Sequence, residues 1–161
     1  MKKLFSTLFA LTLGVASAAQ SANWVVAQHD YRGFPLFIRY PNNLDYDKLQ
    51  PRFPIRIVAT IELTEVKDNG LPVSSYNNSL ESFDNFVVEY FEKRAKGQCV
   101  LVETFGGKRQ FYIYVSDSTD TTAFEKAIKQ QFPQHSVAFE IERDAKWSLI
   151  RRYAKEYMDG D

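Results

Sequence analysis

The chain has 161 residues, with 20 basic and 20 acidic side chains and a formal net charge of zero. This balance argues against a general electrostatic partner such as nucleic acid or an acidic membrane surface. A single cysteine, Cys99, excludes an internal disulfide, and thirteen phenylalanines with nine tyrosines supply a hydrophobic core without one.

The first residues have the three parts of a secretory signal peptide. Lys2 and Lys3 form a basic start, residues 4–15 are apolar, and small residues end at Ala18. The apolar run is shorter than the roughly 20 residues that a membrane-spanning helix needs. We expect cleavage after Ala18, or alternatively after Ala22, and a single domain over residues 19–161 in the periplasm or outside the cell. Loss of the two lysines leaves 18 basic and 20 acidic residues, a net charge of −2. We expect no later transmembrane segment.

Alternating apolar and polar residues predict short strands at residues 24–28 and 36–40, joined by a turn at residues 30–33. Residues 45–54 are polar with two prolines, which indicates a connector with one helical turn. A longer strand is predicted over residues 55–63. A helix is predicted over residues 79–96, because Asn78 and Glu81 have capping-box spacing and Gly97 suits the position after a helix.

Gly106 and Gly107 separate two strands within residues 99–115. Such a two-residue turn needs positive φ, which glycine adopts without steric cost. In the resulting register Thr104 faces Arg109, and the pairing continues in step until Cys99 faces Tyr114. Because side chains alternate, one face toward the helices holds Val100, Val102, Thr104, Arg109, Phe111, Ile113 and Val115, and the second face holds Cys99, Leu101, Glu103, Gln110, Tyr112 and Tyr114.

The rest of the chain adds a helix at residues 121–131, a strand at 136–142 and a last helix at 146–158. Residues 55–142 then have the order β-α-β-β-α-β, which is typical of a ferredoxin-like fold. Right-handed crossovers place both helices on one face of a four-stranded antiparallel sheet. The predicted class is therefore α+β, a ferredoxin-like core with an N-terminal β-hairpin and a C-terminal helix. Either addition could cover the second face.

Several short segments resemble domain-of-unknown-function family 695. They are Trp24, residues 69–72 (Asn-Gly-Leu-Pro), residues 104–114 around the Gly-Gly turn, and residues 144–147 (Asp-Ala-Lys-Trp). Gln110 and Ala145 stand where the family pattern has Glu and Pro. The resemblance covers nearly the whole mature chain. It implies little about function, although some members are fused to a domain similar to an inhibitor of an RNA-degrading enzyme, which implies a protein-binding role.

The candidate binding residues lie on the second face and at the hairpin end: Glu103, Arg109, Tyr112, Tyr114 and Trp147. A buried Arg109 needs an acidic partner, for which Asp84 or Glu81 is a candidate. We interpret it as a brace between the turn and the first helix rather than as a ligand contact. If the helix that carries Trp147 docks on the two tyrosines, it closes a second small core. If it does not, the exposed patch indicates a partner surface.

Catalytic signals are weak. Glu62 and Glu103 share the second face with Tyr112 and could do acid–base chemistry on a sugar, or they are solvated strand residues. His29 and His135 are far apart in the sequence and Cys99 has no neighbouring histidine, so we predict no catalytic residue, no metal ligand and no cofactor. The strand at residues 108–115 is similar to the RNA-binding strand of an RRM, but that motif's glycine is missing, so we expect no nucleic acid partner.

Two functional hypotheses follow. The first is a non-enzymatic binding or protein-interaction module for an unknown protein or small ligand, in an oligomeric state that the sequence leaves open. The alternative is a small hydrolase that uses a carboxylate–tyrosine pair on an open sheet face. A hydrolase predicts a concave pocket where a carboxylate with a raised pKa meets a tyrosine. A binding module predicts an aromatic patch or groove.

Overall fold

The computed structural model describes residues 24–42 and 44–158, so the predicted signal peptide and both cleavage sites lie outside the described residues. Within the described part, the chain has an α+β fold around one antiparallel sheet of six strands in the order β1-β2-β4-β5-β3-β6. The strands are β1 (Trp24–Tyr31), β2 (Phe34–Pro41), β3 (Ile55–Glu62), β4 (Gly97–Phe105), β5 (Lys108–Val115) and β6 (Val137–Arg143). The α+β class is confirmed. The sheet has more strands than the predicted four, and its strand order as a whole differs from that of a ferredoxin-like sheet.

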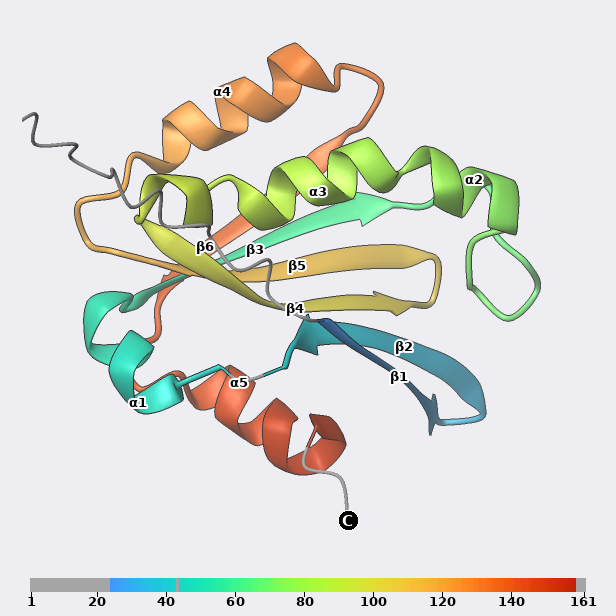
Figure 1. Cartoon of the computed structure of the whole chain (residues 1–161). Coiled ribbons are helices and arrows are strands. Elements are labelled where there is room, and N and C mark those ends of the chain that lie inside the picture. The colour runs from blue at the N-terminus through green and yellow to red at the C-terminus, as the bar shows by residue number, and fades with distance from the viewer. Residues whose placement is uncertain (1–23, 43, 159–161) are drawn as a thin grey trace, which may run out of the picture.

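Helices cover both faces of the sheet (Figure 1). One side carries α2 (Ser74–Ser79), α3 (Glu81–Glu89), the 3-10 turn η2 (Glu92–Arg94) and α4 (Thr121–Gln131). The other side carries α1 (Tyr46–Leu49), the 3-10 turn η1 (Gln50–Arg52), α5 (Ser148–Tyr153) and the π-helical turn η3 (Ala154–Met158). The predicted N-terminal hairpin extends the sheet through pairing of β2 with β4, and the C-terminal helix covers the second face.

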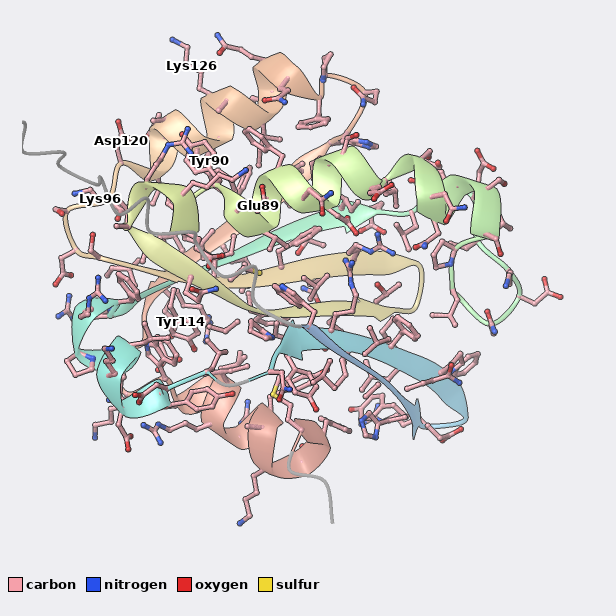
Figure 2. All side chains as sticks on the ribbon, in the orientation of Figure 1. Glu89, Tyr90, Lys96, Tyr114, Asp120 and Lys126 are labelled. Carbon is pink, nitrogen blue, oxygen red and sulfur yellow. The ribbon has the colours of Figure 1, made fainter. Side chains whose placement is uncertain are left out.

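Two hydrophobic cores therefore share the sheet. The first core lies under α3 and α4 and includes Phe83, Val87, Phe111, Ile113 and Phe124. The second core lies under α5 and includes Leu101, Tyr112, Tyr114, Trp147 and Ile150. Figure 2 shows Tyr114 on the α5 side of the sheet, with Glu89 and Tyr90 on the side of α3 and α4. Because both faces are covered, the central strands β4 and β5 are almost wholly buried.

The register of the central hairpin is confirmed from the turn to Leu101, which pairs with Tyr112. Gly106 and Gly107 have φ angles of 56° and 79°, the region that a two-residue turn of this kind requires. Thr104 pairs with Arg109 as predicted. Alternation then sends Phe111, Ile113 and Val115 into the first core and the two tyrosines of β5 into the second, also as predicted.

The far end of β4 differs from the prediction because a β-bulge falls between Cys99 and Leu101. A bulge adds one residue to one strand and reverses the alternation beyond it. Cys99 therefore pairs with Ile113 and lies in the first core, and Val100 lies in the second. The predicted faces of these two residues were wrong. The Cys99 thiol is fully buried, and burial raises its pKa to about 12, which makes it an inert core side chain.

The first helix also differs from the prediction. The chain is helical from Ser74, and Leu80 separates α2 from α3, so Asn78 does not cap a single long helix. The helical region ends at Ala95, which has the left-handed φ of 52°, rather than at Gly97. Gly97 starts β4 instead, where a Cβ atom would lie 2.6 Å from the Tyr114 carbonyl oxygen. By contrast, α4 spans the predicted residues, and the Asp120 side chain caps it by accepting from the Ala123 N–H.

Two of the segments that carry the family resemblance meet at the tip of the central hairpin. The Gly107 N–H donates to the Gly70 carbonyl at 2.9 Å, and the Leu63 N–H donates to the Gly107 carbonyl at 2.8 Å. A Cβ atom on Gly70 would lie 3.1 Å from the Cα of Gly106. The Asn-Gly-Leu-Pro loop thus packs on the Gly-Gly turn, backbone against backbone. No helix within residues 24–42 and 44–158 has the length and apolar character to cross a membrane.

Candidate functional site

The five predicted site residues separate into two places. Arg109 lies on the α3 side of the sheet, 4% exposed. Glu103, Tyr112, Tyr114 and Trp147 lie on the α5 side, in or beside the second core. No single site unites all five, because alternate residues of one strand point to opposite faces.

Arg109 is fully engaged by protein groups. Its Nε donates to the Thr104 hydroxyl at 3.1 Å, its Nη1 to Asp84 Oδ2 at 2.8 Å and its Nη2 to Asn77 Oδ1 at 2.6 Å. Asp84 also accepts from Arg39 at 2.6 Å. These bonds join α2, α3, β2, β4 and β5. They match the interpretation of Arg109 as a brace, with Asp84 as the predicted acidic partner.

Tyr114 and Trp147 form a second structural cluster. Their rings stack with centroids 4.3 Å apart, and the Tyr114 hydroxyl donates to Asp144 Oδ2 at 2.7 Å. The Trp147 indole N–H donates to the Phe53 carbonyl at 2.8 Å, and Trp147 is fully buried. Both residues are therefore part of the second core. Of the two alternatives left open for the second face, the structure has the one in which the helix that carries Trp147 closes a second core, so no open aromatic patch remains over Tyr112 and Tyr114.

Asp144 positions the start of α5. Its carboxylate accepts from the backbone N–H groups of Ser148 and Leu149 at 2.9 and 3.3 Å, and it lies 3.7 Å from Arg56. Burial by itself would raise the pKa of Asp144, but these hydrogen bonds, the Tyr114 hydroxyl and Arg56 together lower it. Trp147 takes a left-handed φ of 54°, an unfavourable conformation for a bulky residue that the buried indole offsets.

Glu103 lies in a different setting, beside a cavity of about 280 Å³ between the end of the central hairpin and the C-terminal helix. Its carboxylate accepts a hydrogen bond from the Tyr153 hydroxyl. We call this cavity the Glu103 pocket. Its lining residues are Tyr31, Leu36, Glu103, Phe105, Arg152, Tyr153, Glu156 and Tyr157.

The pKa values of Glu103 and Tyr153 are both shifted in this pocket. Burial raises the pKa of Glu103, although the Tyr153 hydrogen bond partly opposes this. Burial and the neighbouring carboxylate raise the pKa of Tyr153 well above its ordinary value. Tyr153 therefore stays protonated and acts as a hydrogen-bond donor, and Glu103 is a carboxylate that forms no ion pair within residues 24–42 and 44–158. A concave pocket with such a pair is the feature that the hydrolase hypothesis predicts, with Tyr153 in place of Tyr112.

The other predicted carboxylate–tyrosine pairs do not form. The Tyr112 hydroxyl donates to Gln110 at 3.4 Å, and only 8% of the residue is exposed. Glu62 is exposed and pairs with Lys108 at 3.1 Å. Neither histidine joins the pocket lining: His29 packs edge-on against Tyr157, and His135 packs against Phe83. In the part of the chain that the structure describes, no group of three or more His, Cys, Asp or Glu side chains could hold a metal ion.

A larger hollow of about 630 Å³ lies at the start of α5, lined by Arg56, Glu142, Asp144, Lys146 and Arg152 among others. Its inner polar groups bond to one another, since Arg56 contacts Glu142 at 2.6 Å and Asp144 at 3.7 Å. Most of its other lining side chains are exposed. This hollow is a surface between ion pairs. The smaller Glu103 pocket is the better candidate site, because burial raises the pKa values of Glu103 and Tyr153 there.

The sequence reasoning found Glu103 but missed the residues around it. In the helix predicted over residues 146–158, Tyr153 and Tyr157 lie at helical spacing on the side of Trp147, whereas Tyr31 falls in a predicted turn and Phe105 at a strand end. One signal was available: two tyrosines on the buried side of a helix bring their hydroxyl groups into half-buried positions, where each needs a polar partner. The chain position of that partner depended on how α5 docks.

The sequence model of a family described as "Family of unknown function (DUF695)" matches residues 22–153. The match spans most of the chain, which therefore belongs to this family. Neither the curated proteins nor the solved structures gave a match. The function must consequently be argued from the site itself.

Proposed function

We propose that this protein is a non-enzymatic binding module that holds a small ligand in the Glu103 pocket. The observation that carries the proposal is the partly buried Glu103 carboxylate, which accepts a hydrogen bond from Tyr153 in an aromatic-lined cavity and has no ion-pair partner among the residues that the structure describes. Burying a charged group disfavours folding unless something compensates it. A ligand that contacts Glu103 supplies that compensation.

Binding fits this geometry better than hydrolysis. Acid–base catalysis on a sugar needs a second group, either a carboxylate or a tyrosine that can lose its proton. The raised pKa of Tyr153 keeps its hydroxyl protonated, so it is not available as a base. The second carboxylate of the pocket, Glu156, is exposed, and Glu62 is engaged by Lys108 outside the pocket. One observation favours hydrolysis as the second candidate, namely the raised pKa of Glu103, which suits a general acid.

Ligand-observed NMR on the mature protein tests the proposal, with separate mixtures of neutral sugars, amino acids and small organic amines. We expect saturation transfer to at least one class, and loss of that signal in Tyr157→Ala. Phe34→Ala is the matched control, because Phe34 is 51% exposed and does not line the pocket. Signals that persist unchanged in Tyr157→Ala, or no signal in any class, would contradict the proposal.

Chromogenic nitrophenyl glycosides and esters separate the two candidates. The binding module predicts no turnover above buffer. Turnover by the wild type that Glu103→Gln abolishes would establish the hydrolase instead. Tyr112→Ala and Tyr114→Ala do not serve as probes of a surface, because both tyrosines are buried in the second core.

We further propose that the segment from β3 to β6 is a ferredoxin-like core to which the β1–β2 hairpin is added at one edge. The run β4-β5-β3-β6 within the sheet supports this. Export to the periplasm or outside the cell is proposed from the sequence of residues 1–22 alone. N-terminal sequencing of the protein recovered from a periplasmic fraction tests it, and recovery of the uncut chain only in the cytoplasm would rule it out.

A further inference from the structure

Four aromatic residues line the pocket together with Glu103, two of them from the sheet and two from the C-terminal helix. Tyr31 at the end of β1 and Phe105 at the end of β4 meet edge to face, with ring centroids 5.5 Å apart. Tyr153 and Tyr157 on the C-terminal helix lie with centroids 4.9 Å apart. All four line the same pocket. The faces of aromatic rings carry partial negative charge, so a cavity enclosed by several of them attracts a cation.

The charged side chains of the pocket favour the same sign of ligand. Two carboxylates, Glu103 and Glu156, line it against one cation, Arg152. None of the three forms an ion pair with another residue in the described part of the chain. The Tyr153 hydroxyl donates to the Glu103 carboxylate, and burial raises the pKa of that carboxyl. A ligand cation would supply the counter-charge that this partly buried carboxylate lacks among the described residues.

Other ligand classes fit less well. An anion would meet Glu103 and Glu156 together. A metal ion prefers several oxygen or nitrogen ligands, and here four of the eight lining residues are aromatic and only two are carboxylates. A neutral sugar could stack on the rings but would leave the carboxylate without a counter-charge. Arg32 lies over the Tyr31 ring at 5.3 Å from its centroid, so that ring already contacts a cation.

We infer that the Glu103 pocket binds a small organic cation with an alkylated ammonium group, which sits among the aromatic rings and against the Glu103 carboxylate. The inference rests on the proposed function and names its ligand class. A volume of about 280 Å³ suits a compact group such as a trimethylammonium head with a short tail. Because the cation stabilises the ionised carboxylate, its affinity rises as the pH increases through the pKa of Glu103.

Titration calorimetry with choline as the probe tests the inference, with 3,3-dimethylbutan-1-ol as its neutral isostere. On the mature wild-type protein we expect choline to bind at least about tenfold more tightly than the isostere, since only the cation gains from the rings and the carboxylate. Glu103→Gln should weaken the binding of choline by at least about tenfold and leave the affinity for the isostere unchanged. Glu62→Gln removes an exposed carboxylate outside the pocket and should change neither of the two affinities.

Each outcome decides something. Equal affinity for choline and its isostere, or no saturable choline binding at millimolar concentration, overturns the cation inference. If a neutral compound in the NMR mixtures binds, and Tyr157→Ala abolishes its signal, the pocket keeps its proposed function and only the ligand class is wrong. If no class binds, both proposals fail. Should Glu103→Gln not fold, as judged by far-ultraviolet circular dichroism, the comparison of choline with its isostere on the wild type decides alone.

Discussion

At the scale of single residues, Arg109 shows how a register leads to a contact. The Gly-Gly turn places Arg109 opposite Thr104 on the face toward the helices, where a charge needs a partner. Asp84 was one of two candidates one helix turn apart, and it is the one that forms the bond. Asn77, the third partner, was not predicted. The predicted helix began at residue 79, whereas Asn77 lies in the separate helix α2, from which its side chain reaches Arg109.

We predict that Asp84→Ala destabilises the protein by about 3–5 kcal/mol, because it leaves Arg109 buried without a counter-charge. Urea denaturation followed by circular dichroism measures this. Asp117→Ala is the control: Asp117 pairs with Arg143 at 2.6 Å, but both side chains are about 60% exposed, so we expect a loss of about 0–1 kcal/mol. Equal losses in the two variants would show that Arg109 is not the brace that its contacts suggest.

Glu103 and Asp144 should affect stability with opposite pH dependence. The pKa of folded Glu103 is raised, so its contribution to stability is fully present below the pKa of an unfolded glutamate and is lost as pH rises through the folded pKa. The pKa of folded Asp144 is lowered, so its contribution is present above the unfolded pKa and is lost as pH falls through the folded pKa.

Urea unfolding of the wild type, Glu103→Gln and Asp144→Asn at about pH 3 and about pH 8 separates these effects, because the lower pH lies below the ordinary pKa of both carboxyls. The free energy of unfolding of the wild type minus that of Glu103→Gln should fall as the pH rises. The corresponding difference for Asp144→Asn should rise. The same slope for both variants would mean that burial does not control the Glu103 carboxylate.

At the scale of elements, the bulge in β4 marks a limit of pattern reasoning. Residues 99–102 are Cys-Val-Leu-Val, all apolar, so their order carries no alternation from which to predict which face each one takes. The bulge sends Cys99 and Val100 to the faces opposite to those predicted. Both sides of the strand are core, so either assignment buries apolar atoms, and packing against the helices selects one of them.

The docking of α5 depends on Trp147. We predict that Trp147→Ala costs about 3–5 kcal/mol of stability, because it removes a fully buried indole and the ring stack with Tyr114. Tyr114→Phe keeps that stack and removes only the hydrogen bond to Asp144, so a loss of about 0.5–1.5 kcal/mol is expected. Denaturant midpoints of the two variants provide the measurement. A small effect of Trp147→Ala would show that α5 docks independently of this residue.

At the scale of the whole molecule, one sheet serves two cores, so neither can open without exposing β4 and β5. Cys99 reports on the first core and Trp147 on the second. In a Trp24→Phe background, which leaves one tryptophan, we expect the urea midpoints from Cys99 thiol labelling and Trp147 fluorescence to coincide. Loss of the fluorescence signal at lower urea, while the thiol stays protected, would reveal a second core that opens on its own.

The sequence by itself determined the elements whose cause is local. The Gly-Gly turn, the bounds of α4 and the alternation of β5 depend on neighbours a few residues away, so they could be predicted from the sequence. Only the tertiary structure decided that β2 pairs with β4, that α5 closes the second face, and that Glu103 meets Tyr153 from 50 residues away. Those contacts join surfaces that are far apart in the sequence. Several pairings would bury the same apolar area, and only the folded shape chooses among them.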